Sequence, residues 1–277
     1  FEGDGSALTG IAADKIFEGN TEAEVVDTGS DGHFKVTTEG TERLRIDSSG
    51  RLLFGINSSI SGIPIQIASG YIQQYVAGNN ADPGYLDILK TRNTSASGNT
   101  ILQDGDQIGQ LRFRGNTGSG YVNGALIRAV VNGTPGSGND LPTDLQFHTM
   151  PDGSGSSVER LRITSSGQVL IGTTTEGLSG ADELTIATSG DTGMTIRSGT
   201  SSAGQIFFSD ATSGNAEYAG FIQYLHNQNS LNFGTDETTR MKIDNSGRVL
   251  IGTTTEGEAN ADDLTIAGSG HAGITIR

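Results

Sequence analysis

The sequence predicts an all-β fold made of repeated units, and three observations carry this prediction. Short apolar segments alternate with polar residues at a period of two, and Gly, Ser, Asn and Asp turns separate them roughly every 8–12 residues. One hairpin-like phrase occurs three times, beginning at residues 43, 160 and 240. No convincing amphipathic helix interrupts this pattern. Together these features predict stacked β units rather than a mixed fold.

The composition indicates that one chain alone builds a weak core. Gly, Ser and Thr make up more than a third of the 277 residues, Trp is absent and aromatic residues contribute 6%. Because burial of apolar area drives folding, such a chain has little to bury for its length. The strict patterning of its apolar residues argues against a disordered linker.

Several classes of function are disfavoured at this stage. The absence of cysteine excludes disulfides and thiolate metal sites. The net charge of −15 argues against nucleic acid as a partner, since phosphate binding needs basic patches. The sequence contains no run of about 18 apolar residues, which is the length that a membrane-spanning helix needs. We therefore expect no cofactor, no nucleic-acid partner and no membrane partner.

The repeats divide the chain into four parts. Residues 160–197 and 240–277 align without a gap and are identical at 25 of 38 positions, and residues 43–56 match 160–173 at 9 of 14. The segment GQLRF at 109–113 matches GQIFF at 204–208, and LQFHT at 145–149 matches LNFGT at 231–235. The predicted parts are an N-terminal connector or partial repeat (1–32), a first repeat unit with loop insertions (33–144), a second unit (145–230) and a third, incomplete unit (231–277).

Extra loops explain why the units differ in length. The spacing between matching glycines predicts insertions near residues 71–100, 132–144 and 151–157. Four of the five prolines, Pro83, Pro135, Pro142 and Pro151, lie in these segments. Proline is typical of surface excursions rather than of central strands.

The repeated phrase reads as a β-hairpin. In the first copy, strand RLRI leads through the turn DSSG into strand RLLFG. Asp47 can accept hydrogen bonds from the turn backbone, and Thr164 can do so more weakly. Gly50, Gly167 and Gly247 are expected in the left-handed conformation that closes a type I turn with a bulge. The segments TIR, LTIA and QIFF are predicted as further short strands.

The hairpins predict a surface that needs covering. Strand VLIG is apolar on both faces, which a half-exposed sheet would not tolerate. We therefore expect an elongated, parallel homotrimeric fibre, built from β-hairpin or β-sandwich-like units or as a triple β-helix, in which three chains pool narrow apolar stripes. The residues predicted to form the trimer core are Leu44, Ile46, Leu52, Phe54, Leu161, Ile163, Val169, Ile171, Met241, Ile243, Val249 and Ile251.

The phrases ERLRIDSSGRLLFG, ERLRITSSGQVLIGTTTEG and FEGDGSALTGI resemble the repeats of long tail-fibre and virion-appendage proteins of marine phages, cyanophages in particular. The resemblance covers nearly the whole chain, and its hairpin phrase is the distinctive part. It implies a homotrimeric fibre in the virion, outside the cell, linking the particle to a host-surface receptor. Many such proteins end in a self-cleaving chaperone domain, and no segment here resembles one.

The chain ends at Arg277, which matches Arg197, so we expect a piece of a longer fibre. Its predicted partners are two further copies of itself and other tail or virion proteins at the proximal end. A host receptor or glycan is expected to bind through a distal part.

Candidate chemistry is weak beside this structural reading. The acidic pairs Asp182/Glu183 and Asp262/Asp263 are adjacent, so within a strand they face opposite ways and cannot jointly flank a glycosidic bond. Asp104/Asp106 has a hint of a calcium loop and is better explained as a turn. The four histidines, His33, His148, His226 and His271, show no metal-ligand spacing. We expect no catalytic, cofactor or metal site.

Two other residue groups are candidates for contacts. Tyr71, Tyr75 and Tyr85, in or beside the first insertion, are the aromatic candidates for receptor contact, although local loop packing explains them better. The hairpin arginines are expected to pair across chains with Glu42, Glu159 or neighbouring carboxylates, or to stay solvated; binding of anionic host glycans is the alternative.

The sequence thus favours the shaft of a phage tail fibre, which positions a receptor-binding element and is not an enzyme. Three alternatives remain open: a polysaccharide-degrading tailspike, a capsid or head fibre of the same build, and a monomeric adhesin-like solenoid.

Overall fold

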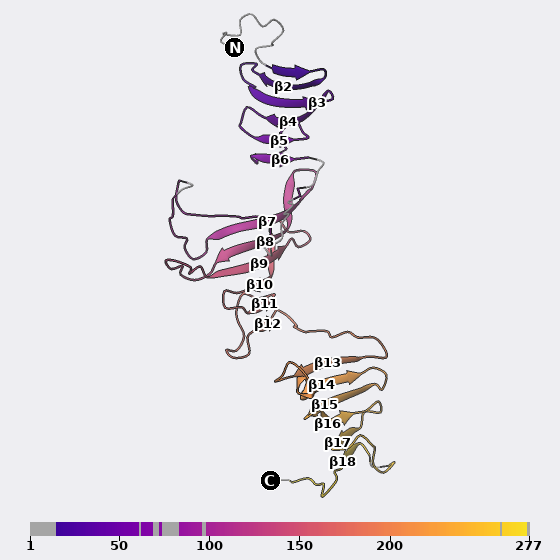
Figure 1. Ribbon diagram of the computed structural model, residues 1–277. Helices are drawn as coiled ribbons and strands as arrows, with labels where there is room; N and C mark the ends of the chain where they lie inside the picture. The colour runs from indigo at the N-terminus through magenta and orange to yellow at the C-terminus, as the bar shows by residue number, and fades with distance from the viewer. Residues whose placement is uncertain are drawn as a thin grey trace, which may run out of the picture. The chain divides into compact units, whose positions relative to one another are not determined.

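The computed structural model describes residues 15–60, 62–68, 72–73, 83–95, 98–260 and 262–275. These residues form three six-stranded β-sheets, and their only helical element is a short 3-10 turn, η1 (Asn215–Tyr218) (Figure 1). The prediction of an all-β chain is therefore confirmed. No helix in the described part of the chain is long and apolar enough to cross a membrane.

Each sheet is a run of consecutive strands. The first sheet contains β1 (Lys15–Glu18), β2 (Thr21–Val26), β3 (His33–Thr38), β4 (Thr41–Ile46), β5 (Leu52–Phe54) and β6 (Ile65–Ile67). The second contains β7 (Gln107–Asn116), β8 (Tyr121–Val131), β9 (Thr143–Thr149), β10 (Val158–Ile163), β11 (Val169–Ile171) and β12 (Leu184–Ile186). The third contains β13 (Ala203–Phe208), β14 (Gly220–Leu225), β15 (Ser230–Thr235), β16 (Thr238–Ile243), β17 (Val249–Ile251) and β18 (Leu264–Ile266).

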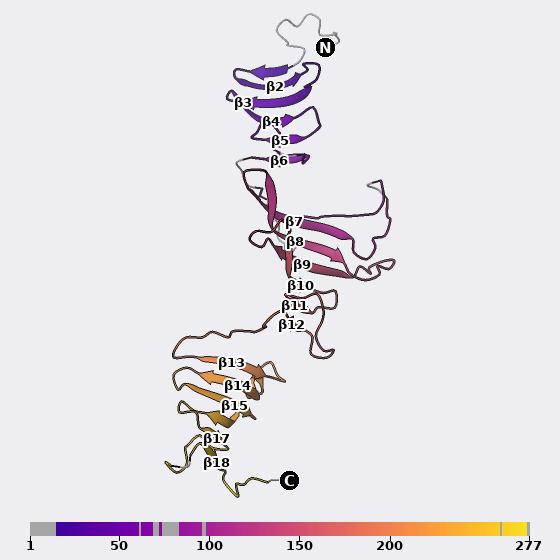
Figure 2. The ribbon, with the colours of Figure 1, turned by 180° about the vertical axis from the view of Figure 1, so that it is seen from behind.

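All three sheets share one topology. Strands follow one another in chain order across each sheet, as both ribbon views show (Figures 1 and 2). The first five strands of each sheet pair antiparallel. The sixth pairs parallel with the fifth, so a crossover segment must join them.

The chain divides into two compact units, residues 1–87 and 88–277. The first sheet belongs to the first unit, and the other two sheets belong to the second. The repeat boundaries expected at 33, 145 and 231 fall at or inside β3, β9 and β15. Each of these is the third strand of its sheet, so each sheet begins two strands before the expected boundary.

One predicted strand is absent. Segment TIR at 195–197 lies outside any strand of the structure, whereas LTI of the LTIA segments forms β12 and β18. The matching TIR at 275–277 extends beyond the described residues. Three alternating residues cannot alone distinguish a strand from an extended connection, because a strand also needs a hydrogen-bonded neighbour.

Strand register gives each sheet one apolar face. Because alternate residues of a strand point to opposite sides, paired residues define which side chains share a face. In the second sheet, the residues in register on this face include Leu111, Ile127, Phe147, Leu161, Ile171 and Ile186. We call this side of each sheet the apolar face and the opposite side the polar face.

The polar face of each sheet is covered at one end by its crossover segment. Leu53, Leu170 and Leu250 point to the polar face and are 0–1% exposed. In the first sheet Gln66, which pairs with Leu53, accepts a hydrogen bond from the backbone N–H of Ile60 and donates one to the carbonyl of Ile63. In the third sheet the N–H of Gly257 donates to Thr265, the partner of Leu250. Each crossover therefore closes a small core on that side.

A β-bulge recurs in the fourth strand of each sheet. The register shifts across Arg43, Arg160 and Arg240. The carbonyl of each arginine accepts a hydrogen bond from a glycine N–H, at 2.9 Å in all three cases. The extra residue places Glu42 and Glu159 on the polar face, which regular alternation would not do.

Candidate functional site

The twelve residues predicted to form the trimer core all lie on the apolar faces. Register places Leu44 opposite Phe54, Leu161 opposite Ile171 and Met241 opposite Ile251. None of the twelve is buried within its own chain. Their packing against other chains stays a prediction, but their common side and incomplete burial are features of the structure.

The exposure of the two faces differs sharply at the end of each sheet. On the apolar face, Ile65, Leu184 and Leu264 of the sixth strands are 61%, 54% and 51% exposed. The neighbouring fifth strands carry Leu53, Leu170 and Leu250 at their centres, and these leucines point to the polar face and are buried. Isolated apolar residues at a surface need no explanation, whereas a continuous patch of them marks an interaction site. The register of each sheet brings its exposed and half-buried apolar residues together on one side.

The first strands of the second and third sheets carry a partial cover. Ile88 lies against Gly109, where a Cβ atom would be 2.3 Å from its Cγ2 atom. Ile196 lies near Gly204 in the same way, with a corresponding separation of 3.5 Å. These two isoleucines cover only the edge of the apolar face, and Leu111 and Phe113 beside Gly109 remain 55% and 54% exposed.

The hairpin turns have the geometry that their residues predict. Gly50, Gly167 and Gly247 have φ values of 74°, 89° and 84°. The Asp47 carboxylate accepts hydrogen bonds at 3.0 Å from the N–H groups of Ser49 and Arg51. At the equivalent position, the Thr164 hydroxyl accepts one at 3.1 Å from the Gln168 N–H. The turns thus fix the register that puts the outgoing strand's residues on the intended faces.

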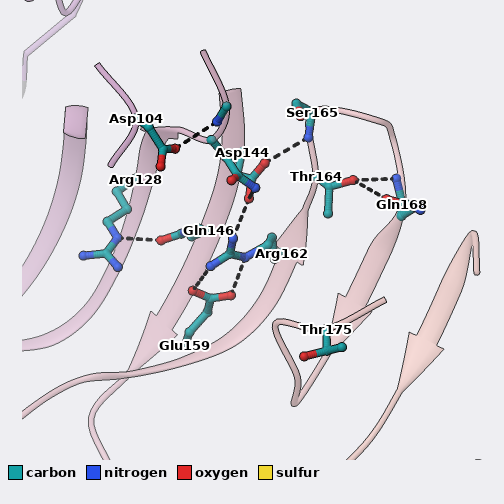
Figure 3. A network of polar contacts seen from close by, with 12 residues as sticks. Asp104, Arg128, Asp144, Gln146, Glu159, Arg162, Thr164, Ser165, Gln168 and Thr175 are labelled. Carbon is teal, nitrogen blue, oxygen red and sulfur yellow. Dashed lines mark hydrogen bonds and ion pairs between the residues drawn. The ribbon is translucent and has the colours of Figure 1, made fainter. Parts of the chain in front are cut away.

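A network of polar contacts covers the second sheet's polar face (Figure 3). Asp144 is fully buried and accepts hydrogen bonds from Arg162 Nη1 at 2.5 Å, Asn132 at 2.8 Å and the Ser165 N–H at 2.9 Å. Arg162 also donates to both carboxylate oxygens of Glu159. A buried carboxylate with three donors is satisfied, so this network has a structural role.

Two hairpin arginines, Arg45 and Arg162, pair with a glutamate of their own chain, while pairing across chains stays a prediction. Arg45 donates to both oxygens of Glu42 at 2.7 Å, and Arg162 does the same to Glu159. The hydrogen bond from Arg45 lowers the pKa of Glu42. The physical reason is the bulge, which brings residues three apart onto one face. An arginine–glutamate phrase with two intervening residues was the signal in the sequence.

Other predicted candidates do not come together. Tyr71 and Tyr75 lie outside the described residues, and Tyr85 is 66% exposed.

Asp106 accepts hydrogen bonds from Arg92 at 2.6 and 2.9 Å, and its N–H donates to the Gln103 carbonyl, as a turn residue does. Arg92 lowers the pKa of Asp106.

The histidines are separated as well. His148 is buried on the polar face, where burial and the nearby Arg128 lower its pKa. His226 stacks edge-on against Tyr224, with ring centroids 5.0 Å apart. Within the described ranges, no group of three metal-ligating side chains is found.

Comparison with known proteins gives limited similarity. No protein-family model matches the chain, and no curated protein matches it. Among solved structures, the chain is similar to the carboxy-terminal domain of the bacteriophage T5 L-shaped tail fibre, with 12% identity, a TM-score of 0.33 and coverage of 75% of this chain and 98% of that one. The same domain with its intramolecular chaperone gives 12% identity, a TM-score of 0.36 and coverage of 74% and 68%. Similarity of this degree does not by itself assign a function.

Proposed function

We propose that this chain is a shaft segment of a homotrimeric phage tail fibre, with a mechanical and positional role and no catalytic one. Three copies run parallel, and their apolar faces meet along a common axis. The shaft holds a receptor-binding element away from the particle. Two parts of this proposal have separate support, namely the assembly and the virion setting.

The apolar face is the observation that carries the assembly. It recurs on all three sheets at matched register, and its residues remain exposed or half-buried in the single chain. Full burial of each Leu or Ile side chain contributes about 1.5–3 kcal/mol. Covering many such residues therefore favours association strongly.

A second copy of the chain is the occupant that fits this face. The occupant must present apolar groups at the same spacing over every sheet, and a parallel copy does so by construction. Each strand offers only two or three apolar residues to the face, which makes the stripe narrow. Three narrow stripes around one axis cover each other, and the polar faces with their ion-pair networks remain outside.

The virion setting rests on the sequence phrases that resemble marine-phage appendage repeats, cyanophage repeats in particular. We propose accordingly that the chain lies in a tail appendage outside the cell. Its proximal neighbours are other virion proteins, and host contact is made by a more distal element.

Introduction of a charge on the apolar face tests the assembly. Ile171→Asp places a carboxylate on the apolar face, whereas Leu178→Asp makes the same change at an 80% exposed position in the crossover segment. We expect Ile171→Asp to dissociate the trimer in analytical ultracentrifugation and Leu178→Asp to leave it intact. A trimer that tolerates both substitutions would contradict the proposed core.

The alternatives predict different results. A polysaccharide-degrading tailspike would release reducing sugar from host envelope polysaccharide, and a monomeric adhesin-like solenoid would sediment as one chain. A head fibre of the same build would show the same mass, and immunogold labelling of intact particles distinguishes it by position.

A further inference from the structure

The β7–β8 hairpin is the place where one sheet departs from the common plan. β7 and β8 have 10 and 11 residues, whereas β13 and β14 have six each (Figure 1). The insertion predicted at 151–157 stands beside this extension, since the Met150 N–H donates to the carbonyl of Gly124 in β8. Of the three sheets, only the second has both the longer hairpin and the inserted loop.

Register places four polar side chains on one face of the extension. Arg112 pairs with Leu126, and Arg114 pairs with Asn123 after a register shift at Gly124. Tyr121 pairs with Asn116 and lies two residues before Asn123. Since residues two apart share a face, Arg112, Arg114, Tyr121 and Asn123 all belong to the polar face.

These residues line a hollow with the inserted loop. The hollow has a volume of about 410 Å³, and its walls are Arg112, Arg114, Tyr121–Asn123, Met150 and Gly155–Ser157. Arg114 is held by a 2.6 Å hydrogen bond from Nη2 to the carbonyl of Tyr121, which fixes one side of the hollow. Tyr121 is 44% exposed, so the hollow is accessible from solvent at this residue.

The charge of the hollow is opposite to that of the chain. The chain carries a net charge of −15, yet no carboxylate is ion-paired with Arg112 or Arg114 in the part of the chain that the structure describes. Strands β7 to β10 place four arginines on this polar face, Arg112, Arg114, Arg128 and Arg162, against the carboxylates Asp144 and Glu159. Arg162 already binds both of these carboxylates, and neither of them is ion-paired with Arg112 or Arg114.

We propose that this hollow binds an acidic saccharide, one that bears carboxylate or sulfate groups. The two guanidinium groups provide the planar, charged donors that match such anions. The Tyr121 ring offers an apolar surface with a polar tip against which a sugar ring can lie. Asn123, Ser156 and Ser157 supply short donors and acceptors for hydroxyl groups. A bare anion would use the arginines and these polar donors but not the ring surface of Tyr121.

One chain forms the whole site, so it does not depend on the proposed trimer. The site lies on the polar face, which the proposed assembly leaves outside. Three copies around an axis would then present three such sites, and a polysaccharide would bind them with higher apparent affinity than a short oligosaccharide.

Calorimetric titration of the 277-residue chain tests the proposal with three hexasaccharides: a sulfated galactan, a galacturonic acid oligomer and a neutral galactan. We expect at least one acidic hexasaccharide to bind and the neutral one not to bind. Arg112→Gln should weaken that binding at least about tenfold, because it removes a charged hydrogen-bond donor. Tyr121→Ala should weaken it as well, through loss of the ring surface.

The matched control is Arg197→Gln, which makes the same charge change at an exposed position outside the hollow. It should leave binding unchanged, and sedimentation and circular dichroism of every variant show whether the fold and assembly are retained. The proposal is overturned if no hexasaccharide binds, or if Arg112→Gln and Arg197→Gln behave alike. Equal binding of inorganic sulfate, unaffected by Tyr121→Ala, would reduce the hollow to a simple anion site and also overturn it.

Discussion

Asp47 and Asp244 close their hairpin turns with charged partners, whereas the equivalent Thr164 uses a neutral one. The carboxylates of the two aspartates bind Arg51 Nε and Arg248 Nε at 2.7 and 2.8 Å. Thr164 instead donates from its hydroxyl to Gln168 at 2.9 Å. The same turn is therefore closed by a charged Asp–Arg pair in two sheets and by a neutral Thr–Gln pair in the second sheet.

This natural exchange predicts a difference in acid sensitivity. The hydrogen bond from Arg248 lowers the pKa of Asp244. A lowered carboxyl pKa contributes stability above the unfolded-state value, about pH 4, and that contribution is lost as the pH falls through the folded-state value. The double variant Asp244→Thr/Arg248→Gln should therefore lose less stability than the parent between pH 7 and about pH 2. Thermal melts across this range measure the difference, and an identical acid loss in both proteins would contradict it.

The turn glycine of the second sheet predicts a strain effect. Gly167 has a φ of 89°, and a Cβ atom there would meet nothing within 4 Å. Gly167→Val should destabilise the protein by more than about 1 kcal/mol through left-handed strain alone. Gly193→Val is the control, since Gly193 has open space and no positive φ. A melting temperature unaffected by Gly167→Val would refute the turn assignment.

Gly172 predicts a larger effect than Gly167 for the same substitution. Its φ is 74°, but a Cβ atom would lie 2.5 Å from the carbonyl oxygen of Ala187. Ala187 also donates a hydrogen bond from its N–H to the carbonyl of Ile171, and this bond joins the fifth and sixth strands. A side chain at position 172 would therefore press on the place where these strands meet. Gly172→Ala should therefore lower the unfolding midpoint in urea further than Gly167→Ala does. Equal shifts would show that the close approach has no energetic consequence.

At the scale of the element, the crossover and the buried leucine beneath it form a small independent core. Leu170 is 1% exposed, and its strand partner Thr185 lies within reach of the crossover glycine Gly177. This core explains why the parallel sixth strand can be only three residues long. Its stability comes from side-chain burial rather than from the short ladder.

Truncation of that leucine is expected to be costly. Leu170→Ala should destabilise the protein by about 2–5 kcal/mol, as cavities in well-packed cores do. Leu178→Ala in the same crossover is the control and should change stability by less than about 0.5 kcal/mol, because Leu178 is 80% exposed. Denaturant unfolding measures both. Similar midpoints for the two variants would mean that the crossover does not pack on Leu170.

The elements also show what the sequence could and could not predict. Alternation and turn chemistry in RLRI-DSSG-RLLFG predict the β4–β5 hairpin, because both signals are local. The bulge at Arg43 and the parallel pairing of β5 with β6 depend on hydrogen bonds to distant residues, which alternation does not encode. Alternation therefore predicts only that VLIG is a strand with apolar residues on both faces, and it does not show the crossover segment that covers the central leucine.

For the whole molecule, the same limit applies to the candidate sites. The residues of the apolar face follow from period-two alternation, so they could be predicted from sequence. The hollow beside Arg112 combines a hairpin extension with the separate loop at residues 151–157, and only the strand register brings them together. The extra length of the first repeat unit was the sole signal in the sequence, and it indicated inserted loops without their position in space.

The central claim is that three chains cover one another's apolar faces. Light scattering after size exclusion gives the absolute mass of the 277-residue chain in solution. The account predicts three times the 28.7 kDa of one chain, with an early, rod-like elution. A mass of one chain would contradict it, because the apolar faces would then be stable in water without a partner, and a mass of two chains would replace the trimer by a two-sheet sandwich.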